Sequence, residues 1–174
     1  MKILYSRICG ESGSAAAYAL LGRAYRSEYG GTLPKIVKTP NGKPYFPAKP
    51  DIHFSLSHSR THVLCVLSDM PVGADIESPR IVSGRAAKYF GSPEELSDFD
   101  PLDLWVLKES CIKLVGGTLL LVKSIHFSYE NGKILTPDMS SFSKLPIFSK
   151  LYRICGCRAA ISSYCSNLPD AIVP

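Results

Sequence analysis

Neighbouring pairs of short strand-like segments constrain the fold of this chain more than any other feature. Residues 52–56 and 63–67 are apolar runs on either side of a short polar stretch, and Val72–Glu77 follows soon after. Phe148–Ile154 and residues 158–165 form a second pair near the end of the chain. Two strands joined by a short turn pair antiparallel, whereas parallel strands need a long crossover. Because strands and helices follow no regular β-α-β order, we expect an α+β fold and not a doubly wound parallel sheet.

Helix signals separate these strand pairs. Residues 14–29 carry apolar side chains at spacings of three and four and end at a Gly-Gly pair, which predicts a helix. The segment Pro101–Val115 begins after an aspartate and ends at two glycines, which predicts another. We also expect a helix over residues 80–90 and another that begins at the Ser-Pro-Glu-Glu run of 92–95. The other expected elements are a strand over 2–6, a proline-rich connection over 34–50, and a hairpin in which 125–129 pairs with 134–135 around an Asn-Gly turn.

The composition fits a globular chain with anionic partners. Its 174 residues can bury a core that needs no disulfide or metal for stability, and the net charge of +5 favours anionic partners such as nucleotides. Six cysteines are present, but the first residues lack the apolar run of a secretory signal. No window approaches the roughly 20 apolar residues of a membrane span. We therefore expect reduced thiols and a cytoplasmic location.

The first candidate site is the pair of acids in Val72–Glu77. On a strand, successive side chains alternate between faces, so Asp75 and Glu77 share one face while Ala74 and Ile76 share the other. Adjacent carboxylates repel each other unless a cation lies between them, and Mg²⁺ prefers oxygen ligands of this kind. The alternative is an exposed polar face that binds nothing.

The second candidate site lies on the predicted helix Pro101–Val115. Trp105, Glu109 and Lys113 are spaced four residues apart, so they lie on one side of that helix. A glutamate between lysines can serve as a metal ligand, or as a general base beside cations that bind phosphate. The alternative is an exposed ion pair worth only about 0.3–0.5 kcal/mol.

A third candidate combines a lysine on a turn with a Ser-His pair. Lys43, in a Gly-Lys-Pro turn, and Ser57-His58, between two strands, can donate hydrogen bonds to phosphate oxygens. A Ser-His-Asp hydrolase is disfavoured, because neighbouring strand residues point to opposite sides and no Gly-x-Ser-x-Gly turn is present. Zinc-dependent hydrolysis with His53, His58 and His62 is a further alternative, although ligands four residues apart suit a helix and the flanking segments look like strands.

Four of these segments follow one another in a distinctive order between residues 41 and 113. They are Gly42-Lys43-Pro44, Phe54-Ser55-Leu56-Ser57-His58-Ser59, Val72-Gly73-Ala74-Asp75-Ile76-Glu77 and Trp105-Val106-Leu107-Lys108-Glu109-Ser110-Cys111-Ile112-Lys113. This order resembles the 4'-phosphopantetheinyl transferases of the surfactin-synthetase-activating type, whose pattern is GKP, F-N-x-SHS, (I/V)G(I/V)D(I/V)E and WxxKES(F/Y)xK. The resemblance extends more loosely to the end of the chain.

The resemblance implies a fold and a reaction. The fold is a pseudo-twofold pair of similar α+β lobes, here residues 1–71 and 72–174, with coenzyme A in the cleft between them. The reaction is a Mg²⁺-dependent transfer of 4'-phosphopantetheine from coenzyme A to a serine of an apo acyl or peptidyl carrier protein, with release of adenosine 3',5'-bisphosphate. A monomer is expected, because one chain supplies both halves of the cleft, and no nucleic acid or membrane partner is implied.

The same resemblance implies roles for individual residues. Asp75, Glu77 and Glu109 correspond to the ligands of Mg²⁺. Lys113 would neutralise phosphate charge, and Glu109 would be the general base for the carrier serine, with Glu95 as a second candidate for that base. Contacts with coenzyme A are implied for Lys43, Ser57, His58, Lys108 and Lys113.

The chain also departs from the family pattern. Its N-terminal lobe is shorter than usual, and Tyr18 stands where the family has an arginine for the 3'-phosphate, with Arg23 and Arg26 nearby. Ala74 replaces a β-branched residue and Cys111 replaces an aromatic one. A module that binds coenzyme A or a nucleotide without transferring any group is therefore the main alternative to an active transferase.

Overall fold

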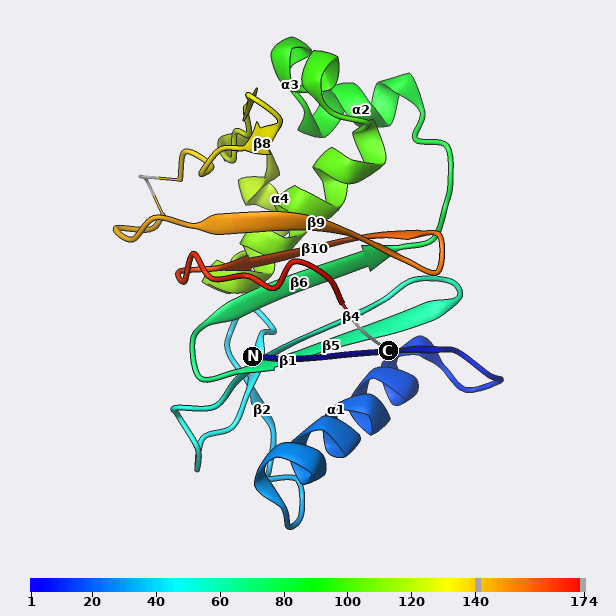
Figure 1. Ribbon diagram of the computed structural model, residues 1–174, viewed down its shortest axis with the longest axis vertical. Helices are drawn as coiled ribbons and strands as arrows, with labels where there is room; N and C mark the ends of the chain where they lie inside the picture. The colour runs from blue at the N-terminus through cyan, green and yellow to red at the C-terminus, as the bar shows by residue number, and fades with distance from the viewer. Residues whose placement is uncertain (140–141, 173–174) are drawn as a thin grey trace.

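Two three-stranded antiparallel sheets, each covered by one long helix, form the body of the chain (Figure 1). The computed structural model describes residues 1–139 and 142–172. The first sheet has the strand order β1-β5-β4 and carries α1, and the second has the order β6-β10-β9 and carries α4. The bounds are Lys2–Arg7 (β1), Gly13–Tyr29 (α1), His53–His58 (β4), His62–Ser68 (β5), Val72–Glu77 (β6), Pro101–Val115 (α4), Phe148–Ile154 (β9) and Cys157–Ser163 (β10). This mixed, antiparallel arrangement agrees with the expected α+β class.

Helix α1 begins and ends where the sequence supplies caps. The Ser12 side chain accepts a hydrogen bond from the backbone N–H of Ala15 (3.2 Å), and Gly30 ends the helix with a φ of 70°. The inner face of α1 packs on β4 and β5, where it joins a core cluster with Val63, Cys65 and Leu67. Its buried apolar residues are Ala16, Ala17, Leu20, Leu21, Ala24 and Tyr25.

Helix α4 lies directly against β6. Asp100 caps its start by accepting a hydrogen bond from the backbone N–H of Leu102 (2.9 Å), and Gly116 ends it in the left-handed conformation, with a φ of 66°. The approach is so close that a Cβ atom on Gly73 would overlap the carbonyl oxygen of Ser110 and the backbone of Leu114. The glycine of the β6 segment is therefore needed to bring the helix and the strand together.

The two sheets meet where β4 runs beside β6. Serine side chains make the link, since Ser55 Oγ accepts from Ala74 N–H (2.9 Å) and Ser57 Oγ accepts from Ile76 N–H (3.3 Å). On the face of β6 opposite Asp75 and Glu77, apolar side chains fill the space between the two sheets. This shared core includes Leu64, Val66, Val72, Ala74, Ile76, Tyr152 and Ile161. The junction places the Ser-His segment of β4 next to the acids of β6.

Several elements are shorter than the sequence predicts. The helix expected over residues 80–90 begins only at Gly84, because Ser83 Oγ caps it by accepting from Ala86 N–H (3.3 Å). Of the hairpin expected at residues 125–135, only four residues pair, while Ile125 and Phe127 are buried in the core around α4. The bounds are Gly84–Phe90 (α2), Pro93–Asp98 (α3), Tyr129–Glu130 (β7) and Lys133–Ile134 (β8).

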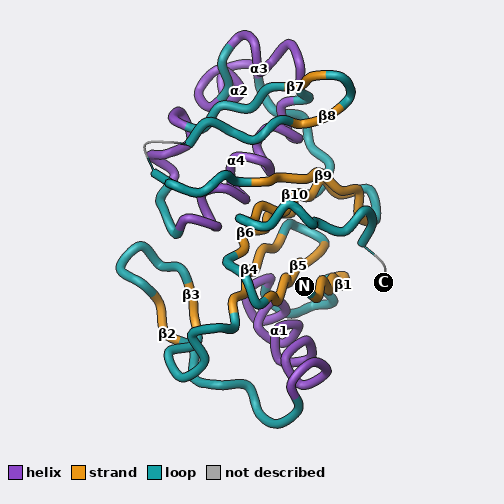
Figure 2. Tube along the Cα trace, turned by 60° about the vertical axis from the view of Figure 1, so that its left-hand side comes forward, coloured by secondary structure: helices purple, strands orange, loops and turns teal. Residues whose placement is uncertain are grey.

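Other elements were not predicted. A 3-10 helix, η1 (Leu119–Ser124), follows α4, and the proline-rich connection contains a small hairpin of β2 (Val37–Lys38) and β3 (Pro44–Tyr45). Figure 2 shows this hairpin beside the two sheets, and the side-chain amide of Asn41 in its turn donates to the carbonyl of Gly116 (3.0 Å). Among the helices of the described residues, none has the length and apolar character needed to span a membrane.

Candidate active site

Two side-chain donors meet at the carboxylate of Asp75, at the junction of the sheets. The residue is only 5% exposed, and its Oδ1 accepts hydrogen bonds from Lys113 Nζ (2.6 Å) and Ser57 Oγ (2.7 Å). Its Oδ2 is also buried, and no donor within the described residues reaches it. Burying a carboxylate oxygen without a partner costs free energy. Oδ2 is therefore the one oxygen of this carboxylate that is available to an incoming cation or donor.

Glu109 is electrostatically coupled to the acids of β6. Burial, followed by the neighbouring Asp75 and Glu77, raises the pKa of its carboxyl group to about 7, against the opposing effect of Lys113. Glu109 lies between Trp105 and Lys113 on one side of α4, as their spacing predicts. This side faces β6, because Trp105 bonds Glu77 and Lys113 bonds Asp75. The three carboxyl groups therefore belong to one region.

Glu77 is held at the far end of β6. Its Oε1 accepts a hydrogen bond from the indole Nε1 of Trp105 (3.2 Å), and the guanidinium of Arg80 lies 3.5 Å from both carboxylate oxygens. Asp75 and Glu77 thus share the face of β6 that looks toward α4, which confirms the alternation predicted from the sequence. Within residues 1–139 and 142–172, no group of three or more His, Cys, Asp or Glu side chains is arranged to hold a metal ion as it stands.

Two small adjoining cavities run along β4 from this acidic region. One, of about 240 Å³, is lined by Lys43, Lys113 and the Gly116-Gly117 end of α4. The other, of about 180 Å³, lies at the start of α1 and has polar side chains from several elements on its wall. Gly42, Pro44 and Leu56 line both cavities. The polar residues that line the second cavity are Ser14, Tyr18, Lys38, Ser57 and His58. Arg23 and Arg26 do not line it.

Lys43 connects the β2–β3 hairpin to the end of α4. Its Nζ donates to the carbonyl oxygens of Leu114 (2.6 Å) and Val72 (3.5 Å), and burial lowers the pKa of its ammonium group to about 8. A cation is favourable at the carbonyl end of a helix. Lys43 therefore lines the cleft, but it already has partners in the protein.

Glu95 and Lys108 are not part of this region. Lys108 is fully buried, and its Nζ donates to Glu95 Oε2 (2.8 Å) and to the carbonyl of Phe90 (2.5 Å). Glu95 is 2% exposed; its Oε2 also accepts from Ser92 N–H (2.9 Å), and its Oε1 accepts from Phe127 N–H (2.9 Å). Both oxygens of Glu95 are thus occupied by buried donors. The two residues form a buried ion pair with each other, and neither lines the two cavities along β4.

The three histidines do not form a common site. His53 and His58 are five residues apart on β4, so their side chains point to opposite faces of the sheet. The ring of His58 lies against Gly13 at the start of α1, whereas His62 Nδ1 contacts Thr61 Oγ1 (2.9 Å) and Cys157 Sγ (3.4 Å). This separation contradicts the alternative of a zinc hydrolase that uses these residues.

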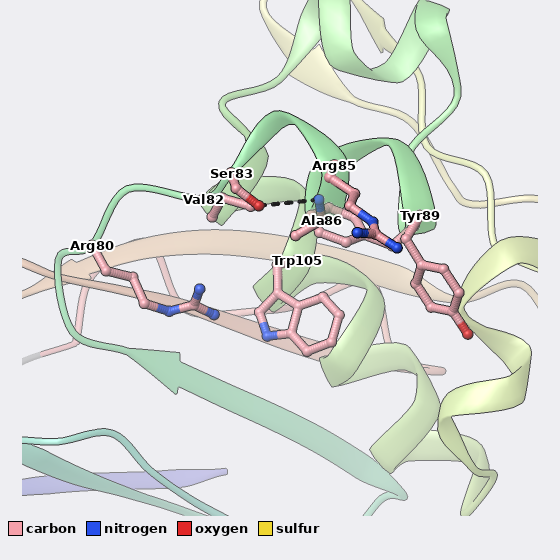
Figure 3. Close-up of a pocket in the computed structure, with 8 residues that line it drawn as sticks. Arg80, Val82, Ser83, Arg85, Ala86, Tyr89 and Trp105 are labelled. Carbon is pink, nitrogen blue, oxygen red and sulfur yellow. Dashed lines mark hydrogen bonds between the residues drawn. The ribbon is translucent and has the colours of Figure 1, made fainter.

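A larger cavity of about 470 Å³ opens beside Glu77, next to α2 (Figure 3). Arg80 and Trp105 point into the same space from opposite sides, and Arg85 and Tyr89 extend from α2 above it. Sequence reasoning did not identify this surface. The signal that could have found it is the Arg80 guanidinium three residues after Glu77, in a segment that was expected to be helical.

Comparison with known proteins yields seven significant matches, all named 4'-phosphopantetheinyl transferases. A 4'-phosphopantetheinyl transferase of Bacillus subtilis is 41% identical over 90 residues, which cover 46% of this chain and 40% of that protein. The 4'-phosphopantetheinyl transferase Sfp of Bacillus subtilis (strain 168) is 33% identical over 144 residues, which cover 75% of this chain and 63% of Sfp. AcpT of Escherichia coli O157:H7 is 31% identical over 125 residues, or 64% of each chain.

This chain therefore spans less than two thirds of the length of these curated relatives. No family model matches it.

Proposed function

This chain belongs to the 4'-phosphopantetheinyl transferase superfamily, and we propose that it transfers the 4'-phosphopantetheine group of coenzyme A to a serine of an apo acyl or peptidyl carrier protein. The observation that supports this most strongly is the convergence of Asp75, Lys113 and Glu109 at the junction of the two sheets, beside a cleft. Buried carboxylates beside a lysine are the groups that a pyrophosphate transfer requires. The second product is adenosine 3',5'-bisphosphate.

The donor set of this junction fits a magnesium ion. Asp75 Oδ2 is buried without a donor, and the pKa of Glu109 is raised in part by Asp75 and Glu77, which indicates uncompensated negative charge. Asp75, Glu77 and Glu109 would supply the hard oxygen ligands that Mg²⁺ prefers. When bound there, the ion would offset the negative charge that develops on the pyrophosphate.

Lys113 and Glu109 would carry the protein's part of the chemistry. The side chain of Lys113 is 30% exposed. Its Nζ faces both Asp75 and the cleft, so it can pair with a phosphate oxygen. Glu109, with a pKa near 7, can accept the proton of the carrier serine hydroxyl, directly or through water, at neutral pH. Attack of that hydroxyl on the β-phosphorus breaks the bond to the bridging oxygen of the pyrophosphate.

The cleft along β4 would hold the rest of coenzyme A. Lys38 and the ring of His58 line its far end, where an anionic group would find positive charge beside the start of α1. Tyr18, which stands at the position of the family's arginine, lines the same cavity and offers a hydroxyl there. Lys43 would shape the wall of the cleft from its position at the end of α4.

The carrier protein would approach from the lobe that bears α2. The cavity beside Glu77 combines Arg80 and Arg85 with Tyr89 and Trp105, a cationic and aromatic surface that suits an acidic helical domain (Figure 3). We place the lobes at residues 1–71 and 72–174, related by a pseudo-twofold axis. A three-stranded sheet under one long helix in each lobe supports this division. A cytoplasmic monomer is part of the same proposal, and the six free cysteines support a reducing compartment.

The test is product formation from coenzyme A. The protein, coenzyme A and Mg²⁺ are incubated with several apo carrier proteins, and adenosine 3',5'-bisphosphate is measured by chromatography. Release is expected only with a carrier whose acceptor serine is intact, and the matched control is the same carrier with that serine changed to alanine. Coenzyme A binding without release for any carrier would overturn the transferase proposal in favour of a binding module.

A further inference from the structure

We propose that Ser57 is a positioning residue, which fixes the carboxylate of Asp75 and the ammonium of Lys113 relative to each other across the junction of the two sheets. This inference rests on the proposed transferase function and concerns its active site. It assigns Ser57 a role different from the contact with a coenzyme A phosphate that the family resemblance implies.

The hydrogen-bonding capacity of Ser57 is fully used inside the protein. Its hydroxyl donates to Asp75 Oδ1 (2.7 Å) and accepts from Lys113 Nζ (2.9 Å) and from the backbone N–H of Ile76 (3.3 Å). A serine hydroxyl has one donor and two acceptor lone pairs, so these three partners satisfy it completely. With Ser57 only 6% exposed, no donor remains for a phosphate oxygen unless the bond to Asp75 is broken.

The geometry gives this hydroxyl two functions at once. It joins β4 to β6 through the backbone of Ile76, and it holds one oxygen of Asp75 against Lys113. Asp75 Oδ1 is thereby occupied, so Oδ2 is the oxygen left free to bind a cation. Groups that orient a metal ligand in this way commonly change metal affinity or activity by about 10- to 100-fold when they are removed.

Ser55 offers a matched comparison on the same strand. It lies two residues before Ser57 and so faces the same side of β4. Its hydroxyl also accepts a backbone hydrogen bond from β6, from Ala74 N–H (2.9 Å), and it is equally buried at 5% exposure. Within residues 1–139 and 142–172, Ser55 makes no side-chain hydrogen bond to the acids of the site or to Lys113; its hydroxyl bonds the backbone of β6. The two serines therefore share the role of joining the sheets, and only Ser57 adds a link to the acidic site.

The experiment compares Ser57→Ala with Ser55→Ala in the full chain. Urea unfolding measures stability, Mn²⁺ binding in the presence of coenzyme A is followed by electron paramagnetic resonance, and steady-state transfer gives kcat and the KM for coenzyme A. Both variants are expected to lose stability, since each loses one link between the sheets, and Ser57→Ala is expected to lose more because it also gives up the hydrogen bonds to Asp75 and Lys113. Ser57→Ala is expected to lose Mn²⁺ affinity and kcat by about 10- to 100-fold with little change in KM, whereas Ser55→Ala keeps the wild-type Mn²⁺ affinity.

Two results would overturn the inference. An increase in the KM for coenzyme A with kcat retained in Ser57→Ala would mean that the hydroxyl binds phosphate directly. Equal Mn²⁺ affinities in the two variants would mean that Ser57 only joins the sheets. If Ser57→Ala does not fold, Ser57→Cys keeps a similar shape with a much weaker donor and is expected to show the same loss. Failure of the proposed function looks different, because the wild type itself would then transfer nothing.

Discussion

Glu109→Gln is the substitution whose consequences the structure defines most fully. The pKa of the Glu109 carboxyl is raised from 4.5 to about 7, first by burial and then by Asp75 and Glu77. A carboxyl whose pKa is higher in the folded than in the unfolded chain stabilises the fold below its unfolded pKa. That contribution declines as the pH rises from about 4.5 and is lost above about 7. Glutamine stays neutral at every pH, so the variant avoids this loss.

The expected magnitude follows from the same shift. A pKa change of this size corresponds to at most about 3 kcal/mol, and partial exposure of the side chain to solvent reduces it to about 1–2 kcal/mol. Without divalent metal, Glu109→Gln should therefore gain about that much stability relative to the wild type between pH 4.5 and 7. The gain arises because the wild type has to ionise a carboxyl group that is buried and lies near Asp75 and Glu77.

Urea unfolding in EDTA at several pH values between 4.5 and 8 measures this difference. Glu130→Gln, at an exposed position of β7, is the control and should track the wild type at every pH. Adding Mg²⁺ at pH 8 should stabilise the wild type more than Glu109→Gln, because the ion compensates the charge of Glu109. A difference between Glu109→Gln and the wild type that stays constant with pH would refute the raised pKa of the Glu109 carboxyl group.

Three further substitutions test other parts of the structure. Lys108→Met should lower the free energy of unfolding by about 3–5 kcal/mol in urea titrations, because it leaves the buried Glu95 carboxylate without its cation; a change below about 1 kcal/mol would show that the pair is dispensable. Gly73→Ala should lower the free energy of unfolding by at least about 3 kcal/mol, because the new methyl group meets the backbone of α4. Gly84→Ala has open space around its Cβ and should leave the free energy of unfolding nearly unchanged in the same titration. Lys43→Gln should raise the KM for coenzyme A more than it lowers kcat in steady-state assays, because it releases one wall of the cleft from the end of α4; an unchanged KM would contradict that placement.

Local sequence patterns were sufficient to predict most of the secondary structure. Val72–Glu77, Pro101–Val115 and Phe148–Ile154 begin and end as expected, because alternation, caps and glycines are encoded by neighbouring residues. The spacing of four on α4 predicted that Trp105, Glu109 and Lys113 share one side of the helix, but not that this side faces β6. The errors lie where tertiary packing decides the structure. At residues 125–128 no strand forms, and Ile125 and Phe127 enter the core around α4.

The candidate site was predicted in part. The face shared by Asp75 and Glu77 follows from strand geometry, but the partners of each residue do not follow from the sequence. Lys108 is adjacent to Glu109, so it lies about 100° further around the helix and points away from the cleft. Glu95 is the third residue of its helix after Ser92, and that spacing is the signature of a capping box, which the structure contains.

The most direct test of the proposed transferase is the intact mass of the acceptor. An apo carrier protein is incubated with coenzyme A and Mg²⁺, together with either the wild-type chain or Glu109→Gln, and its mass is then recorded. We expect the carrier to gain one phosphopantetheine with the wild type, and to gain none with Glu109→Gln or after EDTA is added. A gain that persists with Glu109→Gln would remove this carboxylate from the mechanism, and no gain with the wild type on any carrier would contradict the account as a whole.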